Sequence, residues 1–357
     1  MVDPGANNED HSVVAGGDVF FCRERVIGRI TLNRPKALNA LTEEMCAAML
    51  EHLRRWAADP GVRSVVLDAV PGRAFCAGGD IRAIYEAGKK ADGSVMNFFT
   101  TEYRMNAAIR RFPKPYIALI DGFAFGGGCG VSVHGSYRVA SENAVFAMPE
   151  TAIGLFPDIG ATYFLNRLPG AIGMYLALTG VRIGIADAVY CGLATHHVPA
   201  SELAAVGARL MQGEAIDAIL AQTSRPSAGV PPLSEHRAAI DRAFLAASVE
   251  EVLARLENEG DWGRETASLL RARSPTSLKV TFRQMQEGAR LDFESCQRME
   301  FRIMARMMEE HDFYEGVRAA LIDKDQAPRW QPAELGEVTA SRVAQFFAPS
   351  SQGEFTL

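Results

Sequence analysis

The chain reads Tyr116-Ile-Ala-Leu-Ile-Asp-Gly-Phe-Ala-Phe-Gly-Gly-Gly-Cys-Gly130 at the point that decides its fold. The run 116–120 is apolar and predicts a buried strand. A glycine-rich turn follows and opens a helix to about His134, before a second strand at residues 137–140. The free N–H groups at the start of that helix favour negative charge. The stretch therefore predicts a strand, turn, helix and strand with an anion-facing turn.

A similar unit lies upstream. Residues 19–22 and 26–32 predict a hairpin, and Thr42 is typical of the cap of a helix whose apolar residues lie on one face. A short apolar strand at 64–69 follows, and a second glycine-rich turn, Gly72 to Ile81, comes after it. Alternation of strands and helices predicts an α/β fold.

The second half of the chain is different. From about Ala161 nearly every segment has helical periodicity, for example 201–211, 249–256 and 337–347, with a Pro/Ser-rich break at 224–234. We expect a flexible N-terminus at 1–17, an α/β core at 18–223, a helical C-terminal region at 224–349 and a tail at 350–357.

Composition narrows the functional classes. The 357 residues are 48% hydrophobic and 22% charged, as in ordinary globular proteins, and the net charge of -6 disfavours nucleic acid and anionic membranes as partners. The six cysteines are scattered, the seven histidines lack ligand spacing, and the first twenty residues hold acids where a targeting peptide would be basic. We therefore expect a cytoplasmic protein with free thiols and no metal.

Two carboxylates interrupt an otherwise apolar segment, 147–160. These are Glu150 and Asp158. An ionised carboxylate resists burial unless it is paired or functional, so the pair suggests acid/base chemistry. Simpler explanations stay open: Glu150 is also suited to the start of a helix after Pro149, and Asp158 to the cap of a helix beginning near Gly160.

The glycine turns supply backbone donors for that chemistry. The N–H of Gly79 can face a ligand oxygen, and two such donors on separate turns can form an oxyanion hole. Tight turns and close packing explain the glycines equally simply. Ser132 lies in a near miss to a nucleophile elbow, and Cys76 and Cys129 lie beside the glycines, but no base accompanies either cysteine, so buried packing is the better interpretation.

Three motifs taken together carry a family resemblance. The segments 33–41, 74–81 and 121–129 resemble the crotonase, or enoyl-CoA hydratase/isomerase, superfamily. The resemblance implies a spiral of ββα units with a helical C-terminal region, and a bent acyl-CoA as partner, with no further cofactor. It also implies that the N–H groups of Gly79 and Gly127 polarise the thioester carbonyl. Homo-oligomers are frequent in the superfamily, and the resemblance implies that the helices after Ile183 could pack subunits together, while a monomer stays open.

The same resemblance assigns residues to the CoA arm. By motif position they are Lys36, Ala37, Leu38 and Ala77. Lys36 would place a positive charge near a CoA phosphate, although a solvated surface lysine is an equally good interpretation.

The acids point to one branch of the superfamily. Hydratases carry a Glu two residues after the three glycines, where this chain has Gly130. The segments around Glu150 and Asp158 instead resemble the 3-hydroxyisobutyryl-CoA hydrolase branch, in which these two positions are the catalytic pair. Glu102 aligns with a substrate-contacting Glu of that branch. A salt bridge from Glu102 to Arg104 or Arg110 is the alternative.

The expected function is hydrolysis of a short 3-hydroxyacyl-CoA thioester, with 3-hydroxyisobutyryl-CoA of valine catabolism as the first substrate to test. Two alternatives stay open at this stage. An isomerase or hydratase-like enzyme would use Glu150 as its sole base, and a non-catalytic acyl-CoA-binding protein would need the glycines but no buried acids. Whether Glu150 is a nucleophile or a general base also stays open.

Overall fold

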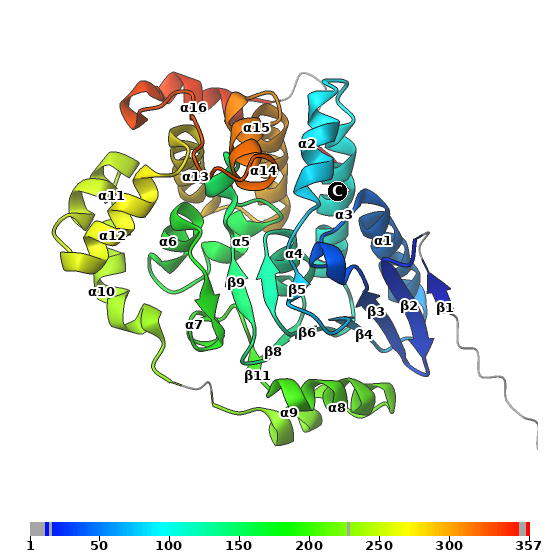
Figure 1. Cartoon of the computed structure of the whole chain (residues 1–357). Helices are drawn as coiled ribbons and strands as arrows, with labels where there is room; N and C mark the ends of the chain where they lie inside the picture. The colour runs from blue at the N-terminus through cyan, green and yellow to red at the C-terminus, as the bar shows by residue number, and fades with distance from the viewer. Residues whose placement is uncertain (1–10, 14–15, 227–228, 350–354) are drawn as a thin grey trace, which may run out of the picture.

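The computed structural model describes residues 11–13, 16–226, 229–349 and 355–357. Most of the predicted flexible N-terminus and most of the predicted tail lie outside these described residues. Figure 1 shows a sheet-containing core on one side and a group of helices wrapped around its other side and top.

A large mixed sheet forms the centre of the core. Its strand order is β1-β2-β3-β4-β6-β8-β11. The pairs β1–β2 and β2–β3 are antiparallel, and the following pairs are parallel. The strands are β1 (His11–Val13), β2 (Val19–Glu24), β3 (Ile27–Leu32), β4 (Ser64–Ala69), β6 (Tyr116–Ile120), β8 (Tyr137–Ala140) and β11 (His196–His197).

A second sheet has the order β10-β9-β7-β5. It contains β5 (Ala74–Cys76), β7 (Phe123–Phe125), β9 (Val145–Ala147) and β10 (Ile183–Gly184). Each successive unit sends its first strand, β4, β6 or β8, to the large sheet and its second strand, β5, β7 or β9, to the small one. The predicted spiral of ββα units is therefore confirmed, as are the strands predicted at 64–69, 116–120 and 137–140.

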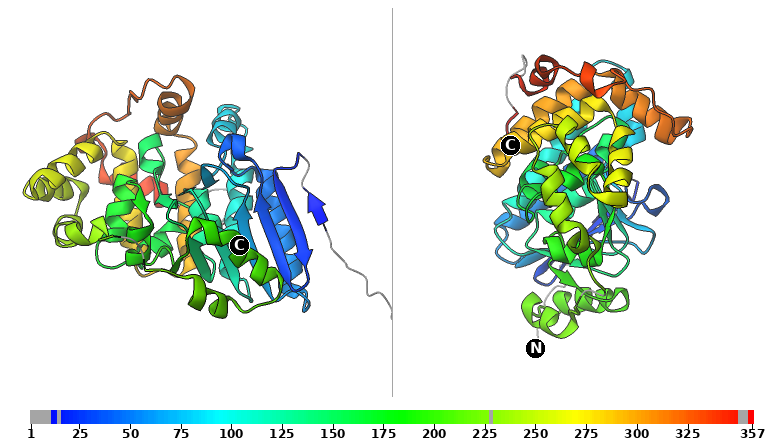
Figure 2. Two further views of the ribbon diagram at one scale, coloured as in Figure 1. Left: turned by 60° about the horizontal axis from the view of Figure 1, so that its bottom comes forward. Right: turned by 90° about the vertical axis from the view of Figure 1, so that its left-hand side faces the viewer.

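Helices cover both faces of the large sheet. On one face, α1 (Glu43–Ala58) packs beside α3 (Val95–Arg110), and the Thr42 side chain caps α1 by accepting from the N–H of Met45, as predicted. The other face is covered by α8 (Ala200–Met211) and α9 (Ile216–Thr223), whose leucines and isoleucines share an apolar cluster with Ile117 and Val139. In the right-hand view of Figure 2 these two helices lie at the bottom of the molecule, apart from the last helices of the chain at the top.

Short elements connect the spiral to the helical region. They are α2 (Ile81–Lys89), α4 (Gly127–Val133), η2 (Glu150–Ile153), α5 (Ala161–Leu165), α6 (Ile172–Thr179), α7 (Ile185–Cys191) and, before α1, η1 (Pro35–Ala37). The helical region follows as α10 (Pro232–Phe244), α11 (Val249–Leu256), α12 (Gly260–Arg271), α13 (Pro275–Gly288), α14 (Phe293–Met307), α15 (His311–Val317), η3 (Arg318–Ile322), η4 (Leu335–Glu337) and α16 (Ala340–Phe347).

The helical region does not have a core of its own. The main apolar cluster runs without a break from Leu32 and Phe75 through Leu176 to Ile303 and Phe346. Helix α13 packs against α5 and α6, and α14 packs against α3 and α5. The C-terminal helices are therefore built onto the segment that follows η2, which is the segment that carries Asp158.

The last described residues return to this core. Phe355 is buried, its ring stacks on Phe301 with centroids 4.3 Å apart, and it meets Tyr103 edge to face. The carbonyl of Thr356 accepts a hydrogen bond from Arg104. Composition alone gave no sign that these residues would pack against α3.

Candidate active site

The two glycine turns meet because β5 and β7 are neighbouring parallel strands of the small sheet. Gly78 has a φ of 98° and Gly126 a φ of 48°, and both lie in the region that glycine adopts most easily. A methyl group built on Gly127 would lie 3.3 Å from the backbone nitrogen of Gly79. The N–H groups of Gly79 and Gly127 therefore lie side by side.

Both donors are available to a ligand. Gly127 is the first residue of α4, so its N–H has no acceptor within the helix. In the same turn, the N–H groups of Ala77 and Asp80 donate to the carbonyls of Leu38 and Leu41. Among the described residues the N–H of Gly79 itself has no acceptor. The pair has the form of an oxyanion hole.

Two glutamate side chains flank these donors. Glu150 begins η2, directly after β9, and a methyl group on Gly126 would lie 2.8 Å from its Oε1. Glu102 comes from α3, and a methyl group on Gly127 would lie 2.6 Å from its Oε1. A side chain at Gly126 or Gly127 would displace a carboxyl group, so the glycines make room for the acids as well as for a ligand.

Asp158 completes a group of three acids. Its Oδ2 accepts a 2.9 Å hydrogen bond from the hydroxyl of Tyr103, a residue that sequence reasoning missed although it is adjacent to Glu102. The capping explanation for Asp158 is wrong. Gly160 is the N-cap residue of α5, and the Asp158 side chain accepts no hydrogen bond from the first turn of that helix. Asp158 is thus free for another task.

Burial raises the pKa values of all three carboxyls. Glu102 and Glu150 are 2% and 7% exposed, and loss of hydration together with the nearby charge of Asp158 raises the pKa of each well above its usual value. Burial also raises the pKa of Asp158 to about 7, while the Tyr103 hydroxyl opposes the rise. Perturbed acids of this kind are typical of functional sites.

The glutamates also keep unused hydrogen-bonding capacity. Oε1 of Glu102 and Oε2 of Glu150 are buried and have no partner among the described residues. The predicted alternative of a salt bridge for Glu102 is wrong, since Arg104 donates to the Thr356 carbonyl and Arg110 to the Tyr163 hydroxyl. Buried acceptors without partners are costly, and a substrate that donates to them would relieve that cost.

A cavity of about 100 Å³ brings these groups together. Its walls include Ala77, Gly79, Glu102, Gly127, Glu150 and Asp158, with apolar side chains such as Phe98, Phe99, Ile153 and Met304. The other residues assigned to the CoA arm lie outside it. Lys36 and Leu38 are exposed and Ala37 is half-buried. A hydrogen bond from the Ala77 N–H to the Leu38 carbonyl joins this segment to the cavity wall. Their contact with a ligand stays a prediction.

Comparison with known proteins assigns the chain to a family. Residues 27–347 match enoyl-CoA hydratase/isomerase. The chain belongs to the enoyl-CoA hydratase/isomerase family. Within that family it is 44% identical over 353 residues to a mitochondrial 3-hydroxyisobutyryl-CoA hydrolase of Danio rerio, covering 96% of this chain and 92% of the relative. It is 43% identical over 345 residues to the Homo sapiens protein of the same name, covering 93% and 89%.

Solved structures agree on the fold. One described as a carnitinyl-CoA dehydratase from Mycobacterium thermoresistibile has a TM-score of 0.90 and 40% identity, covering 95% of this chain and 98% of that one. One described as an enoyl-CoA hydratase from Rhodobacter sphaeroides has a TM-score of 0.89 and 40% identity, covering 95% and 100%. The α/β crotonase-type fold is therefore confirmed, together with the branch of the family that the motifs around Glu150 and Asp158 indicated.

The other nucleophile candidates are packed away. Burial raises the pKa of the Cys76 thiol to about 12 and raises that of Cys129 further above its usual value. The Ser132 hydroxyl is fully buried and donates to the Gly128 carbonyl at 2.7 Å. None of these groups is placed to attack a ligand in the cavity.

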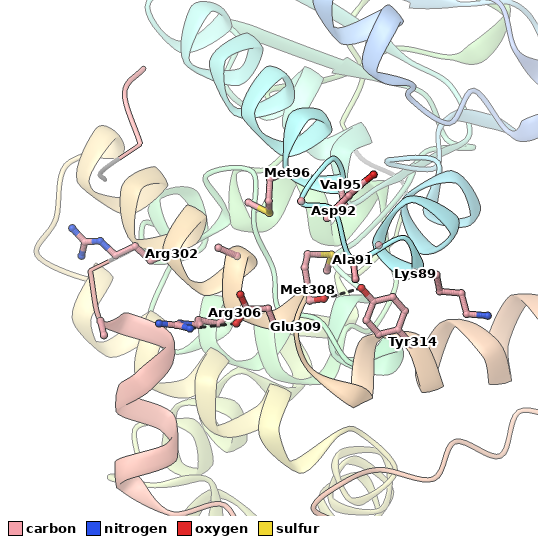
Figure 3. Close-up of a pocket in the computed structure, with 14 residues that line it drawn as sticks. Lys89, Ala91, Asp92, Val95, Met96, Arg302, Arg306, Met308, Glu309 and Tyr314 are labelled. Carbon is pink, nitrogen blue, oxygen red and sulfur yellow. Dashed lines mark hydrogen bonds and ion pairs between the residues drawn. The ribbon is translucent and has the colours of Figure 1, made fainter. Parts of the chain in front are cut away.

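A larger cavity of about 800 Å³ lies between the ends of α2 and α14 and the starts of α3 and α15 (Figure 3). Its charged residues have mixed signs: Lys89, Arg302 and Arg306 against Asp92 and Glu309, with Arg306 paired to Glu309. It contains no residue of the acid group. We therefore place the chemistry in the smaller cavity.

No helix within the described residues is long and apolar enough to cross a membrane. In the same part of the chain no group of three or more His, Cys, Asp or Glu side chains is arranged to hold a metal ion.

Proposed function

We propose that this protein hydrolyses 3-hydroxyisobutyryl-CoA to 3-hydroxyisobutyrate and CoA. One observation carries the proposal: three buried carboxyls surround two free backbone N–H donors in a single cavity. The names of the curated relatives support the choice of substrate.

The thioester oxygen binds between the N–H groups of Gly79 and Gly127. Negative charge that develops on this oxygen meets dipoles that are already in place, and losing one donor of such a pair costs about 3 kcal/mol of transition-state stabilisation. This role agrees with the lack of an acceptor for either N–H group among the described residues, and the close neighbours of both positions leave no room for a side chain.

Glu150 supplies the attacking group by one of two routes. In the first, a Glu150 oxygen bonds to the carbonyl carbon, the C–S bond breaks, the CoA thiolate takes a proton, and water then cleaves the anhydride. In the second, Glu150 takes a proton from water as the water attacks. Single turnover in ¹⁸O-labelled water detects the anhydride route in which water attacks the Glu150 carbonyl, because the first acid product then carries two unlabelled oxygens, one of them from Glu150. Direct attack of water on the thioester always places one labelled oxygen in the product.

The remaining two acids orient the reactants. Asp158, held by Tyr103, orients Glu150 or the water and helps proton transfer. The unpartnered Oε1 of Glu102 accepts the 3-hydroxyl of the substrate. A site built to accept such a hydroxyl discriminates strongly against an acyl group that lacks it.

Hydration or dehydration of the acyl chain is the second candidate, because the two solved structures named above are described as a dehydratase and a hydratase. Against it, position 130 is Gly, and the side chain of Asn106 fills the space beside it, with Oδ1 3.0 Å from a methyl group built there. A hydratase or dehydratase with Gly at this position would have Glu150 as its sole base beside the oxyanion hole.

One incubation separates the candidates. With 3-hydroxyisobutyryl-CoA, hydrolysis releases free CoA thiol, whereas dehydration produces the absorbance of a conjugated enoyl thioester without thiol. A 3-enoyl-CoA in parallel detects isomerase activity. Binding of acyl-CoA with neither product would instead favour the non-catalytic acyl-CoA-binding protein.

Several further points are part of this proposal. We propose a role in valine catabolism, a cytoplasmic location, catalysis without a cofactor other than the CoA of the substrate, and assembly into a homo-oligomer. The curated relatives are named as mitochondrial proteins, so cell fractionation is the test of location. Light scattering of the purified protein tests the oligomeric state.

A further inference from the structure

The segment that carries Asp158 has an unusual backbone. Ile159 has a φ of 55° and Gly160 a φ of 81°, so two consecutive left-handed residues follow the acid. This conformation is strained for a β-branched residue such as isoleucine. Ile159 is nevertheless buried, and it lines the cavity next to Asp158. Strain of this kind persists only where the surroundings hold the chain firmly.

Three side chains hold the peptide groups around Asp158. Nε2 of Gln284 donates to the Pro157 carbonyl at 2.7 Å. Nε2 of His134 is 2.7 Å from the Ile159 carbonyl. On the following residue, the N–H of Gly160 donates to Oε2 of Glu300 at 2.7 Å.

These three side chains come from elements far apart in the sequence. His134 follows α4, Gln284 lies on α13, and Glu300 lies on α14. All are buried, and none of them is among the residues that line the cavity. They hold Asp158 through the peptide groups on either side of it, and the carboxyl of Glu300 also repels that of Asp158 when both are ionised.

The protonation of two of them is set by burial. Burial lowers the pKa of His134 to about 4, so the ring is neutral near pH 7 and its Nε2–H is the donor, because a carbonyl can only accept. Burial raises the pKa of Glu300 to about 8, although the N–H groups of Gly160 and Thr162, 2.7 and 2.9 Å from its oxygens, oppose the rise. A fully buried carboxyl at such a place is expensive and calls for a role.

We propose that Glu300, His134 and Gln284 are positioning residues that fix the backbone of Asp158 and thereby aim its carboxyl into the cavity. The inference rests on the proposed function and deepens it, because it makes the helical region after residue 224 part of the active site. A purely structural explanation is that Glu300 only caps α5, a five-residue helix. The two explanations differ in what they predict for kinetics.

The experiment compares conservative and disruptive variants. Glu300→Gln keeps one acceptor for a backbone N–H but places an amide N–H₂ against the other backbone N–H. His134→Leu removes the donor to the Ile159 carbonyl. His134→Gln keeps a donor at similar reach. We expect kcat for 3-hydroxyisobutyryl-CoA to fall about 10- to 100-fold in the first two variants, as for a small misplacement of a reacting group, with KM changed little. His134→Gln restores most of kcat.

Glu294→Gln is the matched control. Glu294 lies on the same helix as Glu300, but its side chain is 39% exposed and pairs with Arg111 and Arg298. We expect this variant to keep wild-type kcat and KM. Circular dichroism of every variant shows that the fold is retained.

A titration without substrate separates this inference from the proposed function. The titratable groups that face Asp158 are Glu102 and Tyr103 from α3, His134 after α4, Glu150 from η2 and Glu300 from α14. His134→Leu changes no charge near pH 7. If it loosens the segment, both the burial that raises the pKa of Asp158 and the Tyr103 bond that lowers it change, and the carboxyl ¹³C titration of Asp158 moves away from its wild-type position.

The outcomes are distinct. A wild-type protein that releases no thiol from 3-hydroxyisobutyryl-CoA overturns the proposed function and leaves the titration as the test of positioning. A folded His134→Leu and a folded Glu300→Gln with wild-type kcat, and an unchanged Asp158 titration, overturn the positioning role.

Discussion

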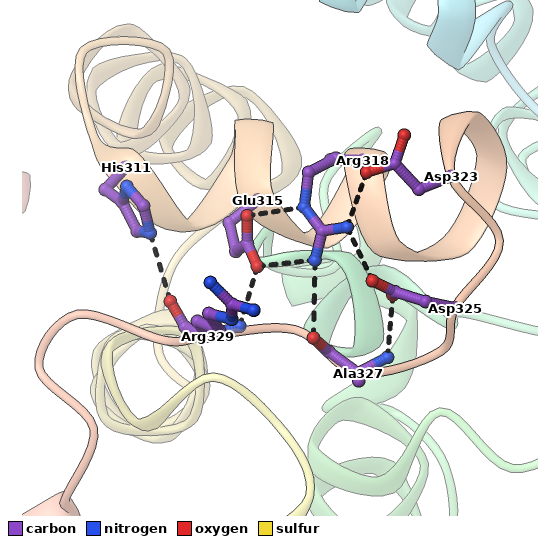
Figure 4. Close-up of polar contacts among 7 residues, drawn as sticks. All are labelled: His311, Glu315, Arg318, Asp323, Asp325, Ala327 and Arg329. Atoms are coloured by element: carbon purple, nitrogen blue, oxygen red, sulfur yellow. Dashed lines mark hydrogen bonds and ion pairs between the residues drawn. The ribbon is translucent and has the colours of Figure 1, made fainter.

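Two groups of carboxylates in this protein behave in opposite ways. In the cavity, Glu102, Glu150 and Asp158 are buried without a cation partner among the described residues, and their pKa values are raised. At the end of α15, one guanidinium, that of Arg318, binds Glu315, Asp323 and Asp325, as Figure 4 shows. There the pKa of Glu315 is lowered to about 2 by its hydrogen bonds to Arg318.

The difference separates function from structure. The Arg318 cluster satisfies each acid and ties residues 323–327 back to α15, as a stabilising network does. The cavity acids gain no such compensation, so the fold carries their cost. Sites that do chemistry commonly depart from the rules that stabilise the rest of a fold. Variants in both groups test this contrast.

Replacing Glu150 tests the group expected to matter most. Glu150→Gln keeps the size of the side chain but removes both the nucleophile and the base. We expect kcat for thioester hydrolysis to fall about 10²- to 10⁴-fold, the range for loss of a positioned acid–base group, with acyl-CoA binding largely kept. Glu315→Gln, in the Arg318 cluster, is the control and keeps wild-type kcat. Turnover at the wild-type rate by Glu150→Gln would exclude the assignment.

The pH dependence of the rate tests Asp158. A carboxyl that must be ionised to assist proton transfer is active above its pKa, which is about 7 for Asp158. We therefore expect kcat/KM to fall as the pH drops through about 7. In Asp158→Asn we expect most of the rate to be lost and the remaining limb to move to lower pH, because the charge of Asp158 no longer raises the pKa of Glu150. A profile that stays flat to about pH 5 would show that no carboxyl with a raised pKa takes part.

The sequence predicted the parts of the site that are local. The glycine turns and Glu150 lie within a few residues of β5, β7 and β9, so strand pattern and motif order suffice to place them. Strand boundaries at 64–69, 116–120 and 137–140 were predicted for the same reason, since each is a short apolar run ended by turn residues.

The contacts that hold the backbone around Asp158 could not be predicted from the sequence. Gln284 and Glu300 bond to backbone groups 127 and 140 residues away, and nothing in their own helices marks them from other polar residues. Tyr103 gave one weak signal, its place beside Glu102. The capping explanation for Asp158 failed because a carboxylate from α14 takes the N–H groups at the start of α5.

The ionisation of the two groups of acids should change the stability of the fold in opposite directions. The pKa of Asp158 rises on folding from 3.8 to about 7, so its ionisation destabilises the fold progressively as the pH rises through this range. Asp158→Asn should therefore raise Tm more at about pH 8 than at about pH 5. The pKa of Glu315 falls on folding from 4.5 to about 2, so its stabilising effect is present above 4.5 and is lost as the pH falls through about 2.

Thermal scans of the two variants at both pH values make the measurement. Glu315→Gln should lower Tm at neutral pH, where the native carboxylate is paired, by an amount reduced through solvent screening. Equal responses of the two variants, in sign and in pH dependence, would remove the distinction between the groups.

The smallest effect is expected at Arg318 itself. Arg318→Lys keeps the charge, but an ammonium cannot reproduce the planar fork that bonds Glu315 through two nitrogens while reaching Asp323 and Asp325. We expect Tm to fall by a few degrees at low salt and by less at high salt, because exposed ion pairs are screened, with kcat unchanged. Helix α15 packs directly against η2, which carries Glu150. A fall in kcat in the folded variant would therefore mean that the cluster sets the position of η2, and that the two groups of acids are coupled rather than separate.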